Sequence, residues 1–412
     1  MNFVFLILFS LFFLYLSWKK PIVALAFIVA FLPSYLIRFK IGFLPMTLLE
    51  LMILILFVIW LIKKKEKWNL SHFKYPIIFW LVAATIAVFV SPDWWPALGI
   101  WKAYFIEPIL FFIVFINVVK TTGSFAGAQD DIGLNLIFRA LGFSALYISL
   151  FAIWQKITGQ GILSLQSWQG EKILRATSIF EYPNAVGLFL APLILIFIGQ
   201  KKQKIFYWLV AFLSLMAIIF AQSEGAIAGI LAGLIFIGLA IKSARKFTLA
   251  GLFISMIIIF SFAPLKNYLW QKASLNDFSG QIRKEMWSET WQMLKEKPIF
   301  GAGLAGYQKA VEPYHKKDYI EIYLYPHNIF FNFWSELGII GLFVFLWLVF
   351  KFFRLGFKSK SSFFIMAAMI AILVHGLVDV PYFKNDLSVL FWLIIGLMQI
   401  SSNQEDKKIP IV

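Results

Sequence analysis

The stretch "YLYPHNIFFNFWSELGIIGLF", residues 322–342, joins a long apolar run to a short row of polar side chains. His327 and Asn328 stand at the head of the run, and Asn332 and Glu336 follow Asn328 at intervals of four residues. Residues four apart lie on the same face of a helix. The stretch therefore predicts a membrane helix that opens on a histidine. Its polar face either bonds to neighbouring helices or contacts a substrate.

Hydrophobicity extends along the whole chain. Of its 412 residues 61% are hydrophobic and 14% are charged, whereas soluble domains contain about 25% charged residues. Lipid offers no partners for unpaired backbone groups, so spanning segments must be helices. Runs long enough to cross a bilayer number about thirteen, near residues 2–17, 21–37, 44–62, 76–91, 98–118, 133–156, 180–199, 204–221, 225–241, 246–263, 327–350, 362–378 and 386–400. The sequence predicts an all-α, polytopic transmembrane bundle of about 12–13 helices.

The distribution of charge predicts the orientation of this bundle. The first segment lacks the basic start and cleavage site of a signal peptide, so we expect it to be retained. Short basic loops favour the cytoplasmic side of a membrane; here they lie at 18–20, 63–67, 201–204, 242–246 and 351–360. The loops predicted to lie on the other side are 38–43, 91–97, 157–179, 222–224, 264–325 and 379–385.

The longest of these outer loops, residues 264–325, divides the chain. We expect transmembrane helices over 1–263 and 326–400, and a cytoplasmic tail over 401–412. Inside the loop, apolar residues recur at the spacing of an amphipathic helix, at Ile282, Met286, Met293 and Leu294. Ser279 is the predicted cap of this helix and Pro298 its predicted end.

The motif G-x-G-x-x-G follows the loop helix, at Gly301, Gly303 and Gly306. A dinucleotide site requires a strand before this motif, and here a helix precedes it. A flexible turn is one interpretation, and a turn whose backbone N–H groups approach a phosphate is another. The chain has no D-x-D, H-E-x-x-H, P-loop or G-x-S-x-G motif. We therefore expect no cofactor, no protein-bound catalytic metal and no nucleotide or nucleic-acid partner.

Polar residues gather at the predicted outer end. Ionisable groups at membrane depth are costly and usually face a cavity. The members of this group are Asp93, Arg175, Glu181, Asn184, Glu224, Arg283, His327, Asn328 and Asp379, with Lys102 and Glu107 slightly deeper. Each has an alternative explanation when taken alone: Arg175 can reach lipid headgroups, Arg283 can lie on a solvated helix face, and His327 can cap a helix.

Three blocks carry a resemblance to the O-antigen ligase and polymerase superfamily of bacterial membrane glycosyltransferases. They are "RATSIFEYPNAVGLFLAPLIL" (175–195), "IRKEMWSETWQMLKEKPIFGAGLAGYQ" (282–308) and "PHNIFFNFWSELGIIGLFVFL" (326–346). A weaker fourth block is "VHGLVDVPYFKNDLSVLFWLIIGL" (374–397). The resemblance covers roughly residues 175–397, whereas the first 170 residues match only as a set of membrane helices.

The resemblance implies a GT-C-like fold at the bacterial cytoplasmic membrane, with the active site on the outer face. Family members transfer a glycan from a polyprenyl-pyrophosphate donor to a lipid, glycan or protein acceptor. By position, the resemblance assigns catalytic roles to Arg175, Arg283 and His327. Many members have Ser-Arg-Gly at the position where this chain has "QSEGA" with Glu224. This chain therefore has no arginine at that position to take the role that the family implies there. The residues expected to contact substrate are Asn184, Asn328, Glu181, Glu224, Lys102 and Asp379.

The chemistry of such a transfer suits these residue types. Negative charge grows on the departing pyrophosphate, and guanidinium groups pair with phosphate through two parallel hydrogen bonds. An imidazole titrates near neutral pH and suits a general base. The same residues leave two rivals: a glycolipid transporter, which places polar groups near the midplane, and a scaffold. Ligase and polymerase share these patterns, and the oligomeric state has no signature in the sequence.

Overall fold

The computed structural model describes residues 3–42, 44–63, 71–123, 132–166, 172–317, 320–359 and 362–406. In this part of the chain six helices are long and apolar enough to cross a membrane, which confirms an all-α polytopic membrane architecture. These segments are Trp94–Val119, Ile132–Thr158, Lys204–Ala221, Lys242–Ser261, Ile329–Gly356 and Asn385–Ser402. Six shorter apolar helices accompany them.

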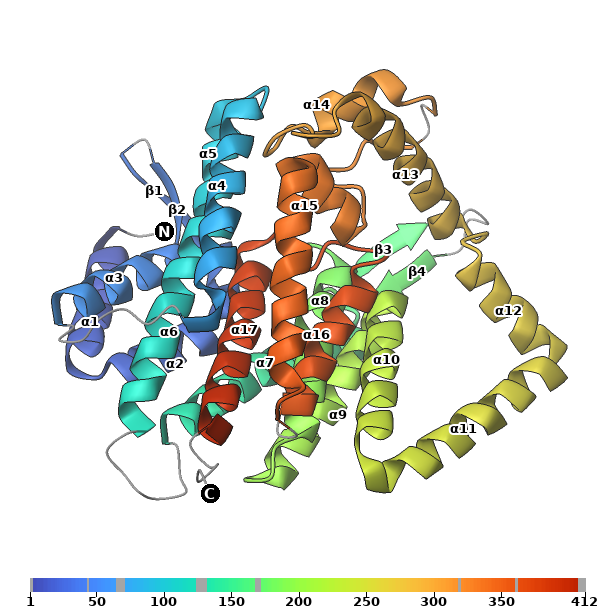
Figure 1. Cartoon of the computed structure of the whole chain (residues 1–412), viewed down its shortest axis with the longest axis horizontal. Helices are drawn as coiled ribbons and strands as arrows, with labels where there is room; N and C mark the ends of the chain where they lie inside the picture. The colour runs from blue at the N-terminus through green and yellow to red at the C-terminus, as the bar shows by residue number, and fades with distance from the viewer. Residues whose placement is uncertain are drawn as a thin grey trace.

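The N-terminal part forms one side of the molecule (Figure 1). Its helices are α1 (Phe3–Lys19), α2 (Pro21–Ala30), α3 (Leu48–Lys63), α4 (Lys74–Val90), α5 (Trp94–Ile100), α6 (Glu107–Gly123) and α7 (Ile132–Thr158). The helix found within the predicted span 21–37 is shorter than that span. It ends at Ala30, and a 3₁₀ turn that contains Pro33 follows. A π-helical turn, Trp101–Ile106, joins α5 to α6 and carries Lys102.

The rest of the bundle surrounds α8 (Pro183–Ile198), which is buried along nearly its whole length. Its neighbours are α9 (Lys204–Ala221), α10 (Glu224–Ala240) and α16 (Phe363–His375). α17 (Asn385–Asp406) packs against α6, and α15 (Ile329–Gly356) packs against α4. A helix that is buried on every side is well fixed in place, so residues at the start of α8 have a rigid base.

Segments of several predicted outer loops and the helix ends next to them lie together at one end of this bundle, which we call the site end. Three backbone hydrogen bonds connect segments far apart in sequence there: Ala176 to Phe220 (3.0 Å), Leu304 to Ala87 (3.1 Å) and Ile329 to Gly376 (2.7 Å). The α8–α9 and α10–α11 turns, which carry basic clusters, lie at the opposite end in Figure 1. The basic residues 64–67 lie outside the described residues. This separation agrees with the predicted topology, whereas the sidedness of the membrane stays a prediction.

Two short antiparallel hairpins occur in the loops, β1 (Arg38–Ile41) with β2 (Leu44–Thr47) and β3 (Leu163–Gln166) with β4 (Lys172–Arg175). Neither was expected in an all-α chain. Both lie outside the apolar helices, where the unpaired edges of a strand can bond to water.

The predicted span 327–350 is confirmed as an apolar segment long enough to cross a membrane, Ile329–Gly356, but it is not one continuous helix. Within α15, Gly338 has φ 71° and ψ −179°, so the chain breaks there into residues 329–337 and 339–356. The short first part begins beside Gly376 at the end of α16, and its last residues contact the loop at Ile299 and Ala302. A local apolar pattern does not report this break, because glycine at positive φ depends on what packs against it.

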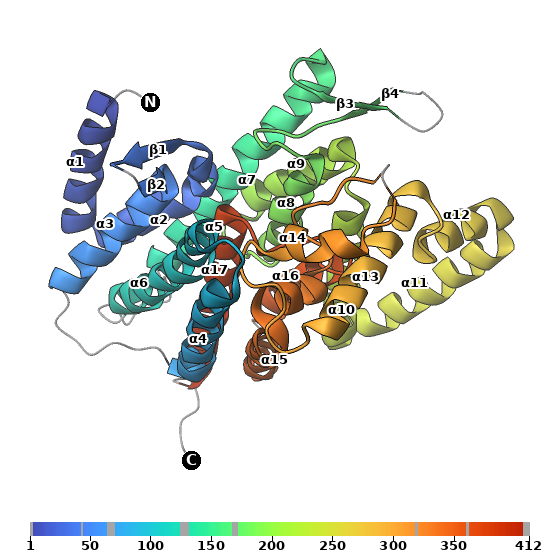
Figure 2. The same ribbon diagram turned by 90° about the horizontal axis from the view of Figure 1, so that it is seen from above.

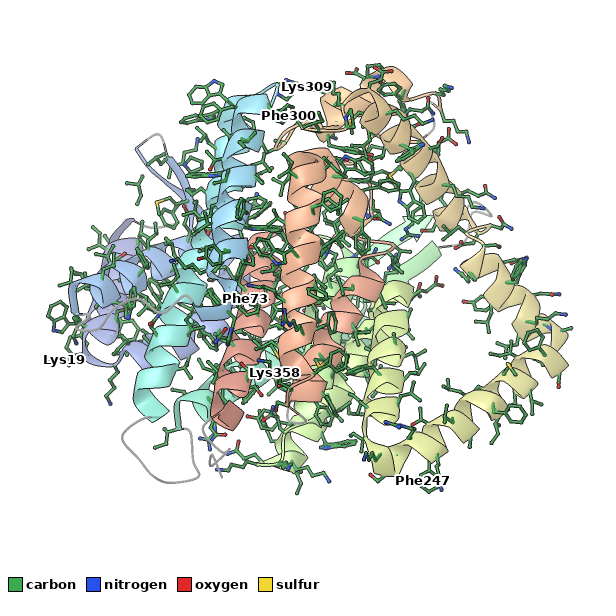
Figure 3. The ribbon with its side chains drawn as sticks, in the orientation of Figure 1. Lys19, Phe73, Phe247, Phe300, Lys309 and Lys358 are labelled. Carbon is green, nitrogen blue, oxygen red and sulfur yellow. The ribbon has the colours of Figure 1, made fainter. Side chains whose placement is uncertain are left out.

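The large loop is more helical than predicted. Between α11 (Lys242–Ser261) and the amphipathic α13 (Phe278–Glu296), an additional helix α12 (Ala263–Ala273) is formed. Figures 1 and 2 show α11 and α12 standing apart from the bundle, and α11 has no buried residue. Phe247 of α11 points away from the molecule (Figure 3). An apolar helix with so few protein neighbours is suited to contact with lipid.

Candidate functional site

Arg175 ends strand β4 and is fixed by three hydrogen bonds. Its Nε donates to the carbonyl oxygen of Ala221 (2.9 Å), and its Nη2 donates to the carbonyl oxygen of Gln222 (3.1 Å) and to Oδ1 of Asn184 (2.8 Å). The two carbonyl groups belong to the turn between α9 and α10, where Gln222 has φ 51°. The guanidinium group is therefore oriented by backbone, and its Nη1 edge remains to contact a ligand.

Asn184 connects this arginine to an aspartate on another segment. It lies in the first turn of α8, and its Nδ2 donates to Oδ2 of Asp379 (2.9 Å). The other carboxylate oxygen, Oδ1, accepts the N–H of Val380 (2.8 Å) and lies 3.3 Å from Nδ1 of His327. Arg175, Asn184, Asp379 and His327 thus form one continuous polar chain across the site end.

His327 occupies an unusual backbone conformation, with φ 45°. Its imidazole packs edge-on against the ring of Tyr323, with 5.3 Å between the ring centroids. Asn328, the next residue, accepts the N–H groups of Phe330 and Phe331 and so caps α15. The Asn328 cap fixes the turn that holds His327. Nδ1 of His327 is buried and faces Asp379, whereas the His327 side chain as a whole is 30% exposed. The Nε2 edge is thereby left to face a substrate.

Asp379 is 9% exposed, yet its surroundings favour the charged form. Burial raises the pKa of a carboxyl group, but the contact and charge of His327, together with the Val380 N–H, outweigh burial. The pKa of Asp379 is consequently held well below its ordinary value. The aspartate is a stable anion beside the imidazole.

Arg283 approaches the same segment from the loop helix α13. Its Nε donates to the carbonyl oxygen of Val378 (3.0 Å), and its Nη1 donates to Oγ of Ser279 (2.7 Å). Burial lowers the pKa of Arg175, and the positive charge of Arg283 lowers it further. The carboxylates of Glu224 and Asp379 act in the opposite direction, but the pKa remains below its ordinary value. Two guanidinium groups whose charges repel across a shared space are suited to bind an anion between them.

The loop helix resembles the prediction in most respects. Met286, Met293 and Leu294 are buried, as their spacing indicated. The predicted Ser279 cap is wrong: the helix begins at Phe278 with Asp277 in the N-cap position, and Ser279 bonds to Arg283 instead. Trp287 donates its indole N–H to the carbonyl oxygen of Pro326 (2.9 Å), which ties the helix to the segment that carries the histidine.

Three other predicted substrate contacts, Glu224, Lys102 and Glu181, are not members of the polar chain, although Glu224 lies near Arg175. Glu224 is exposed and forms an ion pair with Lys272 at 2.8 Å. Lys102 forms an ion pair with buried Glu50 and donates to the carbonyl oxygen of Pro45 (2.9 Å), so it anchors the β1–β2 hairpin. Glu181 is exposed on the turn before α8. In the part of the chain that the structure describes, none of these three is hydrogen-bonded or ion-paired to His327, and their roles stay predictions.

The glycine-rich turn is a packing element. A Cβ atom on Gly301 would lie 2.3 Å from the carbonyl oxygen of Ser335, and one on Gly303 would lie 2.5 Å from the backbone nitrogen of Ser91. The N–H of Ala305 bonds to the carboxylate of Glu336 (2.8 Å). Most backbone N–H groups of the turn already have protein acceptors, which argues against the phosphate interpretation.

A cavity of about 500 Å³ lies beside this turn. Its lining includes Val90, Pro92, Lys297, Phe300 and Lys309. No residue of the polar chain lines it. The cavity is therefore separate from the histidine, and we assign it no role.

Two residues of the site end were missed from the sequence. Oε1 of buried Gln155 accepts the N–H groups of Thr177 (3.1 Å) and Ser178 (2.7 Å), so Gln155 holds the turn that follows Arg175. Lys384 lies over the ring of Phe180, 4.1 Å from its centroid, and burial lowers its pKa. In the sequence, Gln155 and Lys384 are recognisable only as polar residues within or next to apolar segments. That pattern does not show which residues they contact.

The comparison with family models bears on the segment that carries the histidine. Residues 209–346 match the family described as O-Antigen ligase. This segment is therefore similar to the O-antigen ligase family over about a third of the chain. The match includes Arg283 and His327 and ends before Asp379, while Arg175 and Asn184 precede it. No curated protein sequence matches the chain. Together with the apolar helices, the match supports a multi-pass membrane enzyme of the O-antigen ligase or polymerase type.

Proposed function

We propose that the protein is a ligase-like glycosyltransferase that moves a glycan from a polyprenyl-pyrophosphate donor to an acceptor hydroxyl at the outer face of the bacterial cytoplasmic membrane. The observation that carries the proposal is the chain from Arg175 through Asn184 and Asp379 to His327. It joins an anion-binding group to a candidate base at one end of an apolar bundle. The position of the basic turns near residues 201–204 and 242–246 at the opposite end supports the outer location.

His327 acts as the general base. Asp379 faces Nδ1 and favours the tautomer in which Nδ1 carries the proton, so Nε2 is the acceptor. As the acceptor oxygen forms its bond to the anomeric carbon, its proton moves to Nε2. The resulting imidazolium is stabilised by the adjacent carboxylate.

The two arginines assist the leaving group. The bond from the anomeric carbon to the pyrophosphate oxygen breaks, and its electron pair remains on that oxygen. Arg175 and Arg283 bind the pyrophosphate more tightly as this charge develops, which lowers the barrier. Because backbone carbonyl groups orient both side chains beforehand, little reorganisation is needed during the reaction.

The acceptor decides between ligase and polymerase. A lipid-anchored core acceptor makes the protein a ligase, and a second lipid-linked glycan makes it a polymerase of the same superfamily. We favour the ligase because the histidine segment and the preceding loop helix resemble that branch more closely. Independence from a metal ion is part of the proposal.

A reconstituted transfer assay tests the proposal. Wild type, His327→Ala and Arg283→Ala are placed in lipid vesicles with a polyprenyl-pyrophosphate glycan pool, EDTA and candidate acceptors, and products are identified by mass spectrometry. Transfer by wild type that both variants lose supports a metal-independent transferase. Movement of the donor across the vesicle membrane without transfer to any acceptor would instead support a transporter.

A further inference from the structure

The amide of Asn184 has protein partners at both ends. Its Oδ1 accepts from Arg175 and its Nδ2 donates to Asp379, at 2.8 and 2.9 Å. A guanidinium group offers only donors and an ionised carboxylate only acceptors, so this orientation of the amide is the one that satisfies both neighbours. A residue that was expected to contact substrate is therefore engaged within the protein.

The position of Asn184 is rigid. It follows Pro183 in the first turn of α8, in which the residues from Ala185 to Phe197 are buried. Arg175 is held independently by two backbone carbonyl groups, and Asp379 by the N–H of Val380. Removing the amide therefore breaks the connection between the two charged groups but leaves other anchors on each of them.

We propose that Asn184 is a positioning residue that sets the proton affinity of His327 through Asp379 and couples this base to the arginine that binds the leaving group. The inference rests on the proposed transferase function. A hydrogen bond donated to a carboxylate stabilises its negative charge. Without that donor Asp379 binds the imidazolium form of His327 more strongly, so the base gives up its proton less readily.

Other charged and titratable groups surround this histidine and are unchanged in the test. Arg283 approaches from α13, His375 from the end of α16, Tyr323 from the preceding segment, and Glu224 lies near Arg175 at the start of α10. Because these groups are common to all variants, a difference between variants reports on the amide itself.

Histidine NMR of the full-length protein in nanodiscs provides a test that needs no substrate. The chain has four histidines, so ¹³C-labelled imidazole signals are few, and His327→Gln assigns the relevant one. Asn184→Leu keeps the approximate volume but removes both hydrogen bonds, and Asn184→Ala admits water. We expect the titration midpoint of the His327 signal to rise by about half a pH unit or more in Asn184→Leu, and by less in Asn184→Ala.

Asn332→Leu is the matched control. Asn332 is also buried and lies on the short helix after His327, and its side-chain amide has no hydrogen-bond partner among the described residues. Its replacement is expected to leave the midpoint unchanged. If Asn184→Leu does not fold, the titration midpoint of His327 in Asn184→Ala is compared with that of wild type instead. Midpoints in folded Asn184 variants equal to wild type would overturn the inference.

The transfer assay then separates the two proposals. In the Asn184 variants we expect the acidic limb of the plot of kcat against pH to move to higher pH, because His327 must be unprotonated to act as the base. A purely structural role would lower kcat without moving the limb. Absence of transfer by wild type would contradict the proposed function, whereas transfer with an unmoved limb would contradict only the role of Asn184.

Discussion

Nδ1 of His327 lies 3.3 Å from Oδ1 of Asp379. The histidine precedes α15 and the aspartate lies between α16 and α17, so only the folded bundle brings them together. The carboxylate is held in its charged form, and the imidazole keeps one edge toward solvent. The carboxylate is also connected to the guanidinium group of Arg175 through the amide of Asn184.

Asp379→Asn tests whether this pair acts in catalysis. An amide can hold the ring in place, but it does not stabilise the imidazolium and it can favour the wrong tautomer. We expect kcat for glycan transfer to fall by about 10²- to 10⁴-fold, with a much smaller change in KM for the donor. Asp93→Asn is the control, because Asp93 caps α5 away from the pair. A variant with near-normal kcat would show that Asp379 is not needed by the base.

The stability of the same variant should depend on pH. The pKa of Asp379 is lower in the folded protein than the ordinary value of about 3.9 that an unfolded chain has. The ionised Asp379 therefore contributes fully to the free energy of unfolding when the pH is above that ordinary pKa. This contribution is lost as the pH falls toward the pKa of the folded state. We expect Asp379→Asn to have a lower Tm than wild type from pH 5 to 8, and the difference to shrink below about pH 4. A Tm difference that grows on acidification would contradict this sign.

Arg175→Lys asks whether charge alone is sufficient. Lysine keeps the positive charge but cannot bond simultaneously to Ala221, Gln222 and Asn184 while presenting a planar edge to phosphate. We expect kcat/KM for the donor to fall by about tenfold or more, since a bidentate site loses its geometry. Arg245→Lys, on exposed α11, is the control. Equal activity of the two variants would indicate that Arg175 serves as a simple point charge.

The sequence predicted those parts of the molecule that depend on local pattern. Apolar runs gave most of the helices, and the spacing of Met286, Met293 and Leu294 gave the buried face of the loop helix. The break at Gly338 was missed because it depends on Ile299, whose carbonyl oxygen would lie 2.0 Å from a Cβ atom at that position. The residue types of the site could be named in advance. Their pairing could not, because no local signal links Asn184 to Asp379.

The glycine-rich turn gives a prediction about stability. Gly303 has φ 76°, and a Cβ atom there would lie 2.5 Å from the backbone nitrogen of Ser91. Gly303→Ala should lower the free energy of unfolding by about 1–3 kcal/mol or more, because both the left-handed conformation and the contact disfavour a side chain. Gly251→Ala, in helix α11 with no atom within 4 Å, should be neutral or slightly stabilising. Thermal unfolding in the same detergent compares them, and equal Tm values would contradict the packing role.

Glu336 provides the last test, because the polar face of its helix could either bond within the bundle or contact a substrate. Its Oε2 accepts the N–H of Ala305 at 2.8 Å, so it connects the short helix after His327 to the glycine-rich turn. Glutamine offers a carbonyl oxygen to the same N–H, whereas leucine leaves that buried donor unpaired at a cost of about 1–3 kcal/mol. We therefore expect Glu336→Gln to keep most of its transfer activity and stability, and Glu336→Leu to lose stability. A Glu336→Gln protein that is stable but inactive would mean that the carboxylate takes part in the reaction and is not only a structural acceptor.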